Sequence, residues 1–274
     1  MRVAMRRAAH QIFDKPLVLD DPIAVRIIGP EAEARISAER AKYFGEASQA
    51  IRAFMAVRSR FAEDELARAV RRGASQYVIL GAGLDTFAYR NPFPESTLRV
   101  FEVDYPATQE WKRKRLEAGR IAIPSSVTFA PVDFEKQTLR EGLLNAEFDS
   151  GKPAFFSWLG VVMYLTEEAI ASTLGFAASM PKGGAIAFDY AVPRSSLGWT
   201  QRMMLDGLSR RVAAAGEPFR TFFNPAVLAA RLKNTGFHSL QDLGAQEINQ
   251  RYFRNRADGL RITGELARLI SAEI

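Results

Sequence analysis

Two apolar runs separated by a glycine turn constrain the fold of this chain more than any other feature. Val78-Ile79-Leu80 leads into Gly81-Ala82-Gly83, and about twenty residues later a second apolar run ends in Glu102-Val103-Asp104. A strand, a Gly-x-Gly turn and a second strand that ends in a carboxylate form half of a nucleotide-binding crevice. The glycines let the backbone approach a ligand closely, and the carboxylate accepts hydrogen bonds from ribose hydroxyls. The third glycine of the dinucleotide fingerprint is missing, since Asp85 and Thr86 stand where Gly-x-x-Gly would continue.

Strand and helix patterns alternate through the middle of the chain, which predicts the α/β class with a mostly parallel sheet. Residues 46–72 carry the strongest helical pattern, because apolar positions recur along one face. We expect strands at 77–80, 100–104, 127–130, 154–158, 185–190 and 238–243, and a seventh at Arg251-Tyr252-Phe253.

The chain of 274 residues is expected to form a single domain, residues 1–274, with four parts. Residues 1–72 are predicted as a helical N-terminal extension and residues 73–190 as the ligand-binding core. Residues 191–222 break the alternation of strand and helix, which indicates a helical insertion or lid. Residues 223–274 are predicted to complete the sheet and to end in an amphipathic helix at 258–272.

The composition excludes several kinds of site. Cysteine is absent, which excludes disulfides, thiolate catalysis and cysteine metal sites. His10 and His238 are the only histidines, so we expect no bound metal. No apolar run approaches ~18 residues and the basic N-terminus leads into no apolar segment, so we expect a cytoplasmic protein without a membrane span. The formal net charge of +6 is spread along the chain, and its local clusters have the spacing of solvated helix faces, so a nucleic-acid partner is not expected.

Acidic residues follow several of the predicted strands: Asp85 after the glycine turn, Glu102 and Asp104 on the second strand, Asp133 after the third and Asp189 on the fifth. Because the carboxyl ends of parallel strands share one edge, we expect these acids to line one crevice. Each of the four aspartates also has a simpler interpretation as a helix cap or turn residue. Together they suit a ligand with hydroxyls, an amino group and a positive charge, whereas the glycine turn lacks the Lys or Arg that a polyphosphate favours. S-adenosylmethionine, which carries a sulfonium and no phosphate, therefore fits better than a dinucleotide.

Arg58 is the one unexpected charge in the helix predicted at 46–72. It lies inside the apolar stripe, four residues after Phe54 and three before Phe61. A cation at such a position either extends its charged end to the surface or pairs with a buried anion. The pattern alone leaves both interpretations open.

Several short motifs occur in order along almost the whole chain. They are Leu19-Asp20-Asp21-Pro22-Ile23-Ala24, Arg58-Ser59-Arg60-Phe61, Leu80-Gly81-Ala82-Gly83-Leu84-Asp85-Thr86, Phe101-Glu102-Val103-Asp104-Tyr105-Pro106, Val132-Asp133-Phe134, Gly160-Val161-Val162-Met163-Tyr164-Leu165 and Arg251-Tyr252-Phe253. Through them the chain resembles the leucine carboxyl methyltransferase-like family, including its bacterial branch of S-adenosylmethionine-dependent O-methyltransferases. The resemblance implies a Rossmann-like class I methyltransferase fold, with a seven-stranded, mostly parallel sheet and helices on both faces.

The resemblance also implies S-adenosylmethionine as cofactor and a role for individual residues. Arg58 would hold the methionine carboxylate of the cofactor, and the backbone of Gly81 and Gly83 would pass beside its methionyl and ribose parts. Asp104 would bind the ribose hydroxyls. Asp133 and Phe134 would hold the adenine. Family members often carry a glutamate, near the cofactor's amino group, just before the Gly-Val-x-Met-Tyr-Leu segment. Here that position is Leu159.

The expected reaction is transfer of the methyl group to a carboxylate or hydroxyl oxygen of a small molecule or a protein C-terminus. A carboxylate is already nucleophilic, whereas a hydroxyl must lose a proton in or near the transition state. The candidates for catalysis are Tyr164, Asp189 and Tyr190. Arg251 and Arg90 are candidates for binding an anionic acceptor.

Three alternatives remain open at this point. An NAD(P)-dependent oxidoreductase would also use Asp104 for ribose, although the incomplete glycine fingerprint disfavours it. A methyltransferase acting on RNA would explain the positive charge, but no aromatic and basic cluster supports it. A non-catalytic cofactor-binding scaffold would keep the same crevice without turnover.

Overall fold

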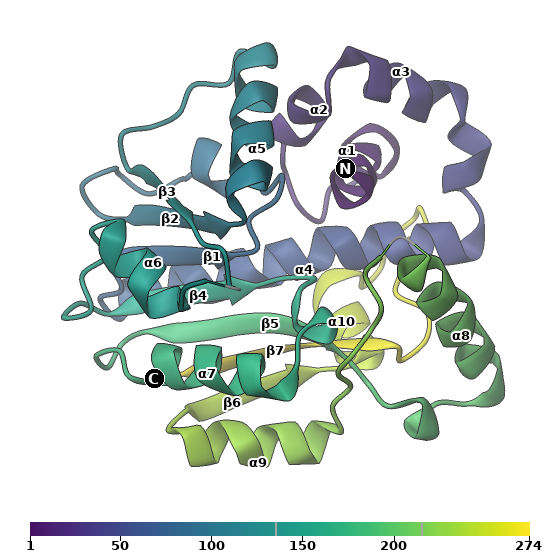
Figure 1. Cartoon of the computed structure of the whole chain (residues 1–274). Helices are drawn as coiled ribbons and strands as arrows, with labels where there is room; N and C mark the ends of the chain where they lie inside the picture. The colour runs from purple at the N-terminus through teal and green to yellow at the C-terminus, as the bar shows by residue number, and fades with distance from the viewer. Residues whose placement is uncertain (135, 215) are drawn as a thin grey trace.

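A seven-stranded sheet with the order β3-β2-β1-β4-β5-β7-β6 forms the centre of the computed structural model (Figure 1). The structure describes residues 1–134, 136–214 and 216–274. Five strands pair in parallel, and β7 runs antiparallel to both β5 and β6. The strands are β1 (Gln76–Leu80), β2 (Arg99–Asp104), β3 (Val127–Pro131), β4 (Ala154–Trp158), β5 (Ala185–Ala191), β6 (His238–Leu243) and β7 (Ala267–Glu273).

The central strands are buried on both faces, as parallel strands covered by helices must be. Every residue of β1, β4 and β5 is buried, and alternate side chains enter two different cores. Val78 and Phe156 join one core, whereas Ile79 and Phe155 join the other. Helices α6 (Leu139–Asn145), α7 (Glu167–Ala178) and α9 (Pro225–Thr235) cover the first face. Helices α4 (Glu46–Arg71) and α10 (Ala245–Tyr252) pack on the second, and α5 (Pro106–Ala118) lies beside β3.

Local capping signals explain where several helices begin. The side chain of Thr166 accepts a hydrogen bond from the Ala169 amide at the start of α7, and Glu167 and Glu168 occupy its first turn. Asn224 caps α9 through the Ala226 amide, with Pro225 as first helical residue. Such residues satisfy amides that have no partner inside the helix. The predicted long helix at 46–72 is likewise confirmed as α4.

The sequence-based prediction was wrong for the last segment of the chain. Residues 251–253 are not a strand, because α10 runs through Tyr252 and buries Ala245 and Ile248 at helical spacing. Residues 258–272 are not a helix either, since Gly259 and Gly264 have positive φ and the chain then enters β7. β7 lies between β5 and β6, so it buries consecutive residues, and that pattern was mistaken for one side of a helix.

The N-terminal extension consists of α1 (Arg2–Phe13), α2 (Ile23–Ile28) and α3 (Pro30–Ala38), which lie above α4 and beside α5 in Figure 1. Their apolar side chains form a third core that includes Leu84 of the glycine loop and Leu116 of α5. The predicted insertion contains α8 (Trp199–Ala213), between β5 and α9. No helix in the described ranges combines the length and apolar character needed to cross a bilayer.

A buried ion pair joins α1 to α4. Both carboxylate oxygens of Asp14 contact the Arg52 guanidinium, at 2.7 Å each, and Asp14 also lies 2.8 Å from Nδ1 of His10. Nε2 of His10 accepts a hydrogen bond from the Val18 amide at 3.0 Å, which places the imidazole proton on Nδ1. Burial alone would raise the pKa of Asp14, but the hydrogen bonds from Arg52 and His10 hold this pKa below its ordinary value.

We expect Asp14→Asn to lower the free energy of unfolding at pH 7 by about 3 kcal/mol, because it leaves the Arg52 charge buried without its counter-ion. The pKa of Asp14 is lower in the folded state than in the unfolded state, where it is about 3.9. The pair of Asp14 and Arg52 therefore stabilises the fold fully above this unfolded-state pKa. Its contribution is lost as the pH falls through the folded-state pKa of Asp14. Thermal unfolding between pH 7 and pH 3 should therefore show a flatter acid decline for Asp14→Asn. Parallel curves for parent and variant would contradict this.

Candidate active site

The order in which the chain adds strands to the sheet reverses between the neighbouring strands β1 and β4. β2 and β3 lie on one side of β1, and β5 lies on the far side of β4, so the crevice of this sheet opens at the carboxyl ends of these two strands. The residues directly after the strands are Gly81 after β1 and Leu159-Gly160 after β4. Asp104 ends the neighbouring β2. The site is therefore built at the edge that the sequence predicts.

The glycine loop is tied closely to β2. The amides of Gly81 and Ala82 both donate to the carbonyl of Val103, at 2.9 and 3.0 Å, and the amide of Gly83 donates to Oδ2 of Asp104 at 2.6 Å. Gly81 has a φ of +68°, and a Cβ there would come within 2.6 Å of the Val161 side chain. Only glycine allows both the backbone angle and this close approach.

Asp104 is held at the rim of the crevice. Its second oxygen, Oδ1, accepts from the Tyr105 amide at 2.7 Å, and the residue remains partly exposed. Each carboxylate oxygen can accept more than one hydrogen bond, so both oxygens keep capacity for a ligand hydroxyl. The Val132 amide donates to the Asp104 carbonyl at 2.9 Å, which brings Asp133 and Phe134 to the same edge. Phe134 is 61% exposed, and Asp133 forms an ion pair with Lys136 at 2.9 Å.

Arg58 pairs with a buried anion, which resolves the ambiguity of its position in the apolar stripe. Its Nη1 lies 3.3 Å from Oδ2 of Asp189 on β5, and both side chains are buried. The other oxygen of Asp189 accepts from the Gly160 amide at 2.5 Å. Among the described residues, Asp189 is the one acid that forms an ion pair with Arg58, so the rest of its fork can accept a ligand carboxylate.

Gly160 is a functional position that the sequence reasoning did not single out. Its φ is +72°, and a Cβ at this position would lie 2.6 Å from Nη1 and 2.9 Å from Nη2 of Arg58. The guanidinium therefore lies directly against the Gly160 backbone. A glycine immediately after the buried strand β4, inside one of the ordered motifs, was the signal available in the sequence.

The structure places Glu102, which was predicted as a cofactor ligand, in the interior. Its carboxylate is fully buried on β2, where it lies 2.7 Å from the Lys112 ammonium of α5 and 3.0 Å from the Tyr89 hydroxyl. Burial raises the pKa of Glu102, while Lys112 opposes the shift. Asp104 lies two residues further along the same face, at the strand end, and is the acid that reaches the crevice.

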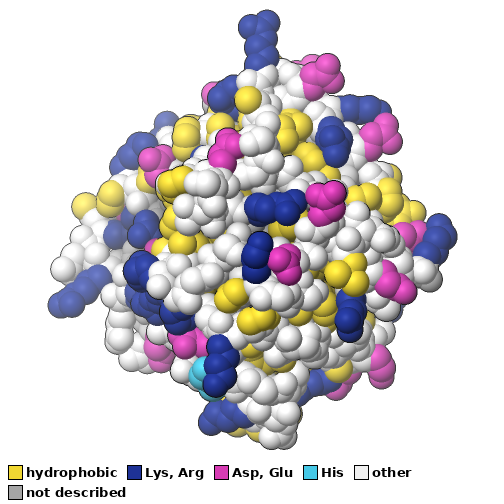
Figure 2. Space-filling view, turned by 90° about the vertical axis from the view of Figure 1, so that its left-hand side faces the viewer, with side chains coloured by type: hydrophobic (Ala, Val, Ile, Leu, Met, Phe, Trp, Pro, Cys, Tyr) yellow, Lys and Arg dark blue, Asp and Glu magenta, His cyan; other side chains and the backbone are white. Residues whose placement is uncertain are grey.

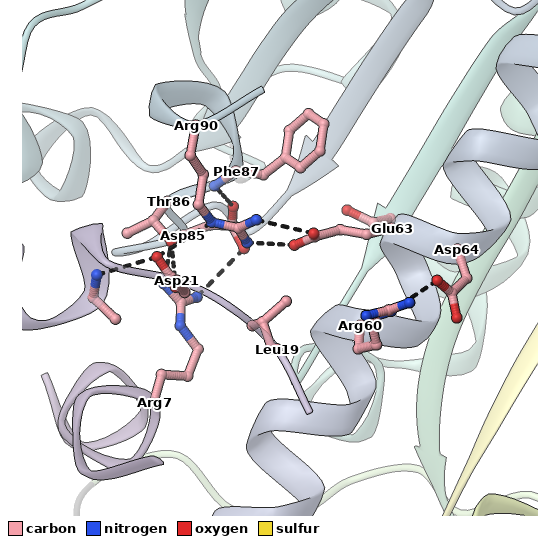
Figure 3. Close-up of polar contacts among 12 residues, drawn as sticks. Arg7, Leu19, Asp21, Arg60, Glu63, Asp64, Asp85, Thr86, Phe87 and Arg90 are labelled. Carbon is pink, nitrogen blue, oxygen red and sulfur yellow. Dashed lines mark hydrogen bonds and ion pairs between the residues drawn. The ribbon is translucent and has the colours of Figure 1, made fainter. Parts of the chain in front are cut away.

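Arg90 and Arg251, which were predicted to bind an acceptor, both lie in ion pairs within the protein. Both guanidinium groups are already paired, Arg90 with Glu63 and Asp21 (Figure 3) and Arg251 with Asp64 and Glu65 of α4. Nη1 of Arg251 also donates to Gln241 at 2.8 Å. These arginines fix α4 to its neighbours.

The three predicted catalytic residues separate in the structure. Tyr190 points to the opposite face of β5 from Asp189, and its hydroxyl donates to Asp242 of β6 at 2.6 Å, so it lies away from the crevice. Asp189 is engaged by Arg58 and Gly160. Tyr164 packs on Phe219 with ring centroids 5.3 Å apart. Burial raises the pKa of Tyr164, and Glu217 adds to the shift.

Asp85 also differs from its predicted role as a cofactor ligand. Its Oδ1 accepts from the Phe87 amide at 2.8 Å, and its Oδ2 lies 3.4 Å from Nη1 of Arg7 (Figure 3). Burial alone would raise the pKa of Asp85, but Arg7, Lys112, the Phe87 amide and Arg90 hold it below its ordinary value. This carboxylate therefore serves the N-terminal helices.

The charged residues show no large basic area on the face in view in Figure 2. Lys and Arg side chains are intermixed there with Asp and Glu and with apolar side chains. A surface that binds nucleic-acid backbone needs a continuous basic patch or stripe. That face therefore gives no support to the RNA-binding alternative.

Comparisons with known proteins agree with this geometry. The leucine carboxyl methyltransferase family model matches residues 1–178. YktD of Bacillus subtilis, named as an inferred S-adenosyl-L-methionine-dependent methyltransferase, is 34% identical over 278 residues, covering 94% of this chain and 91% of YktD. Rv3399 of Mycobacterium tuberculosis, with the same type of name, is 34% identical over 174 residues, covering 61% of this chain and 49% of that protein.

Two solved structures share the fold along their length. A DUF574 family protein from Streptomyces avermitilis has a TM-score of 0.59 at 16% identity, covering 100% of this chain and 97% of that one. An inferred methyltransferase from Thermobifida fusca has a TM-score of 0.56 at 15% identity, covering 99% and 93%. The strand order and these neighbours show the Rossmann-like class I methyltransferase fold. The family match and the likeness to YktD along almost the whole chain show that this chain belongs to the leucine carboxyl methyltransferase family.

Proposed function

We propose that this protein transfers the methyl group of S-adenosylmethionine to an oxygen atom of a small-molecule or protein C-terminal acceptor. The observation that carries the proposal is the arrangement of two opposite charges on either side of the glycine loop. Arg58 lies against Gly160 at the end of β4, and Asp104 holds the Gly83 amide at the end of β2. A ligand with a carboxylate at one end and ribose hydroxyls at the other matches this pair.

The residues present fit S-adenosylmethionine better than a dinucleotide. The loop Gly81-Ala82-Gly83 carries no cationic side chain, and a short 3₁₀ turn, Phe87–Tyr89, follows it. A pyrophosphate is usually held at the N-terminus of a packed helix in this position. Exposed Phe134 at the end of β3 offers an aromatic face, and Asp133 a carboxylate, for the adenine.

Bound S-adenosylmethionine supplies an electrophilic methyl group on a sulfonium. The residues of this chain position it: Arg58 for the carboxylate, Asp104 for the ribose, and Gly81 and Gly160 for the close approach of the backbone. The aromatic rings of Tyr164, which follows β4, and Phe219 pack against each other. Positioning and exclusion of water suffice when the acceptor oxygen is already ionised.

The surroundings of the crevice favour a carboxylate acceptor over a hydroxyl. His10 is buried in its contacts with Asp14 and Val18, and His238 starts β6, opposite Glu273 at the end of β7, far from the strand ends that form the crevice. Asp189 is occupied by Arg58. The pKa of Tyr164 is raised by burial, so its hydroxyl stays protonated at neutral pH and is no base. A hydroxyl acceptor would need a base that none of these residues provides.

We expect S-adenosylmethionine and S-adenosylhomocysteine to raise the melting temperature, because a ligand that binds only the folded state stabilises it by about 2.7 kcal/mol at a hundredfold excess over Kd. Thermal unfolding with millimolar ligand measures this, with NAD and NADP in parallel. Stabilisation by the dinucleotides alone would favour the oxidoreductase and overturn the proposal.

Arg58→Ala and Asp104→Ala should each weaken S-adenosylhomocysteine binding at least tenfold, about 1.4 kcal/mol. Titration calorimetry well below the melting temperature of each variant measures this. Arg60→Ala is the matched control, since Arg60 is an exposed arginine two residues away that pairs only locally with Asp64 (Figure 3). If all three variants bind alike, the assigned site is wrong.

Gly160→Ala should weaken the same binding at least tenfold, because the added Cβ would displace the Arg58 guanidinium and strain a backbone with positive φ. Gly207→Ala serves as control. Gly207 lies within α8 with no atom near its added Cβ, so the change should leave binding unaltered and stabilise the helix by up to about 1 kcal/mol. Equal binding by both variants would contradict the role of Gly160.

Transfer of radiolabelled methyl groups into fractionated small-molecule and protein extracts identifies the acceptor class. A carboxyl methyl ester should release volatile methanol in mild alkali, whereas a methyl ether retains its label. We expect alkali-labile product. Alkali-stable product would identify a hydroxyl acceptor, and cofactor binding without transfer to any fraction would favour the scaffold alternative.

A further inference from the structure

A group of buried and partly buried polar residues connects the N-terminal helices to the glycine loop (Figure 3). We call this group the cap cluster. It contains residues from the ordered motif at 19–24, which the site described above does not use. Its members are Arg7 of α1, Asp21 before α2, Glu63 of α4, and Asp85, Thr86 and Arg90 after the glycine turn.

Asp21 and Arg7 hold the far end of the loop from two directions. Oδ2 of Asp21 accepts from the Thr86 hydroxyl at 2.6 Å and lies 3.2 Å from Nη2 of Arg7. The same Nη2 donates to the Leu84 carbonyl at 3.1 Å and to the Thr86 oxygen at 2.8 Å. Nη1 of Arg7 reaches Asp85 at 3.4 Å. Three consecutive loop residues are thus held by the N-terminal helices.

The cluster is tied in turn to α4. Nε of Arg90 lies 3.2 Å from Oδ1 of Asp21, and its guanidinium pairs with both oxygens of Glu63. The side chains of Arg7 and Asp21 are 6% and 0% exposed. Such charges are stable in the interior only while their partners stay in place.

Among the described residues, the hydrogen bonds and ion pairs that join Leu84, Asp85 and Thr86 to other elements go to Arg7 and Asp21. In this fold type the chain after β1 usually forms a helix that packs the glycine turn against the sheet. Here all residues between β1 and β2 are described, and the only helical element among them is the 3₁₀ turn Phe87–Tyr89. β2 fixes Gly81 to Gly83 through Val103 and Asp104. Leu84 to Thr86 are held instead by the cap cluster and by the packing of Leu84 against the N-terminal helices.

We propose that Arg7 and Asp21 are positioning residues, and that seating of α1 and α2 on the glycine loop completes the cofactor site. The inference rests on the proposed function, since it concerns the affinity for S-adenosylmethionine at this loop. Neither residue touches the crevice, and both act through Leu84 to Thr86. If seating of the helices favours binding, the cofactor must favour seating by the same factor, because coupling between two equilibria is reciprocal.

The first experiment compares cap-cluster variants with a control outside the cluster. Arg7→Gln, Asp21→Asn and Thr86→Val should each raise the Kd for S-adenosylhomocysteine at least tenfold, measured by calorimetry at a temperature where every variant is folded. Arg72→Gln is the matched control, because Arg72 also loses an ion-pair partner in this change but pairs with Glu273 at the end of β7, away from α1, α2 and the glycine loop. Its Kd should stay within twofold of the parent. Equal Kd changes in control and cap-cluster variants, or no change in any, would overturn the proposal.

The second experiment needs no variant and so does not depend on their folding. Amide hydrogen exchange in residues 2–28 of the unmodified protein should slow at least fivefold when S-adenosylhomocysteine is added. Exchange in α9, on the opposite face of the sheet, serves as the internal reference and should not change. Unaltered exchange in residues 2–28 despite measured binding would overturn the coupling. Absence of binding by the parent would instead refute the proposed function.

Discussion

The buried ion pair between Arg58 and Asp189 is the contact on which the geometry of the crevice depends. It joins a helix that precedes the sheet to the fifth strand, 131 residues later. Asp189 divides its two oxygens between the Arg58 guanidinium and the Gly160 amide, so one side chain fixes both the cation and the turn after β4. The desolvation of this pair is offset only while both partners remain. The crevice therefore keeps its shape and its charge by the same interaction.

The first six strands and the position of the crevice could be predicted because they depend on local pattern. Buried apolar runs, two glycines and a terminal Asp104 are sufficient to place a parallel sheet and its ligand edge. The C-terminal segment could not be predicted in this way. β7 forms its hydrogen bonds with β5 and β6, on either side of it, and these pairings are not visible in a local pattern. Its short run of buried residues is equally compatible with one face of a helix.

The roles of individual charges were harder to predict, because a sequence does not show which opposite charge a residue meets in space. Glu102 and Asp104 look equivalent, yet Lys112 holds one in the core and the strand end exposes the other. Arg90 and Arg251 were expected to bind an acceptor, but acids of α4 neutralise both. Arg58 was different, since its place within an apolar stripe already required either a surface exit or a buried partner.

The sparse packing of α8 contrasts with the packing of the elements that form the crevice. Leu205 is the one buried residue of this helix, all of which the structure describes, and its first residue, Trp199, is 76% exposed. The cofactor-side residues come instead from strand ends and from α4, which share the main cores. The sequence of a helix with so few buried side chains can change at small cost to the free energy of unfolding. Substitutions along α8 therefore leave the strand ends and α4, which form the crevice, in place.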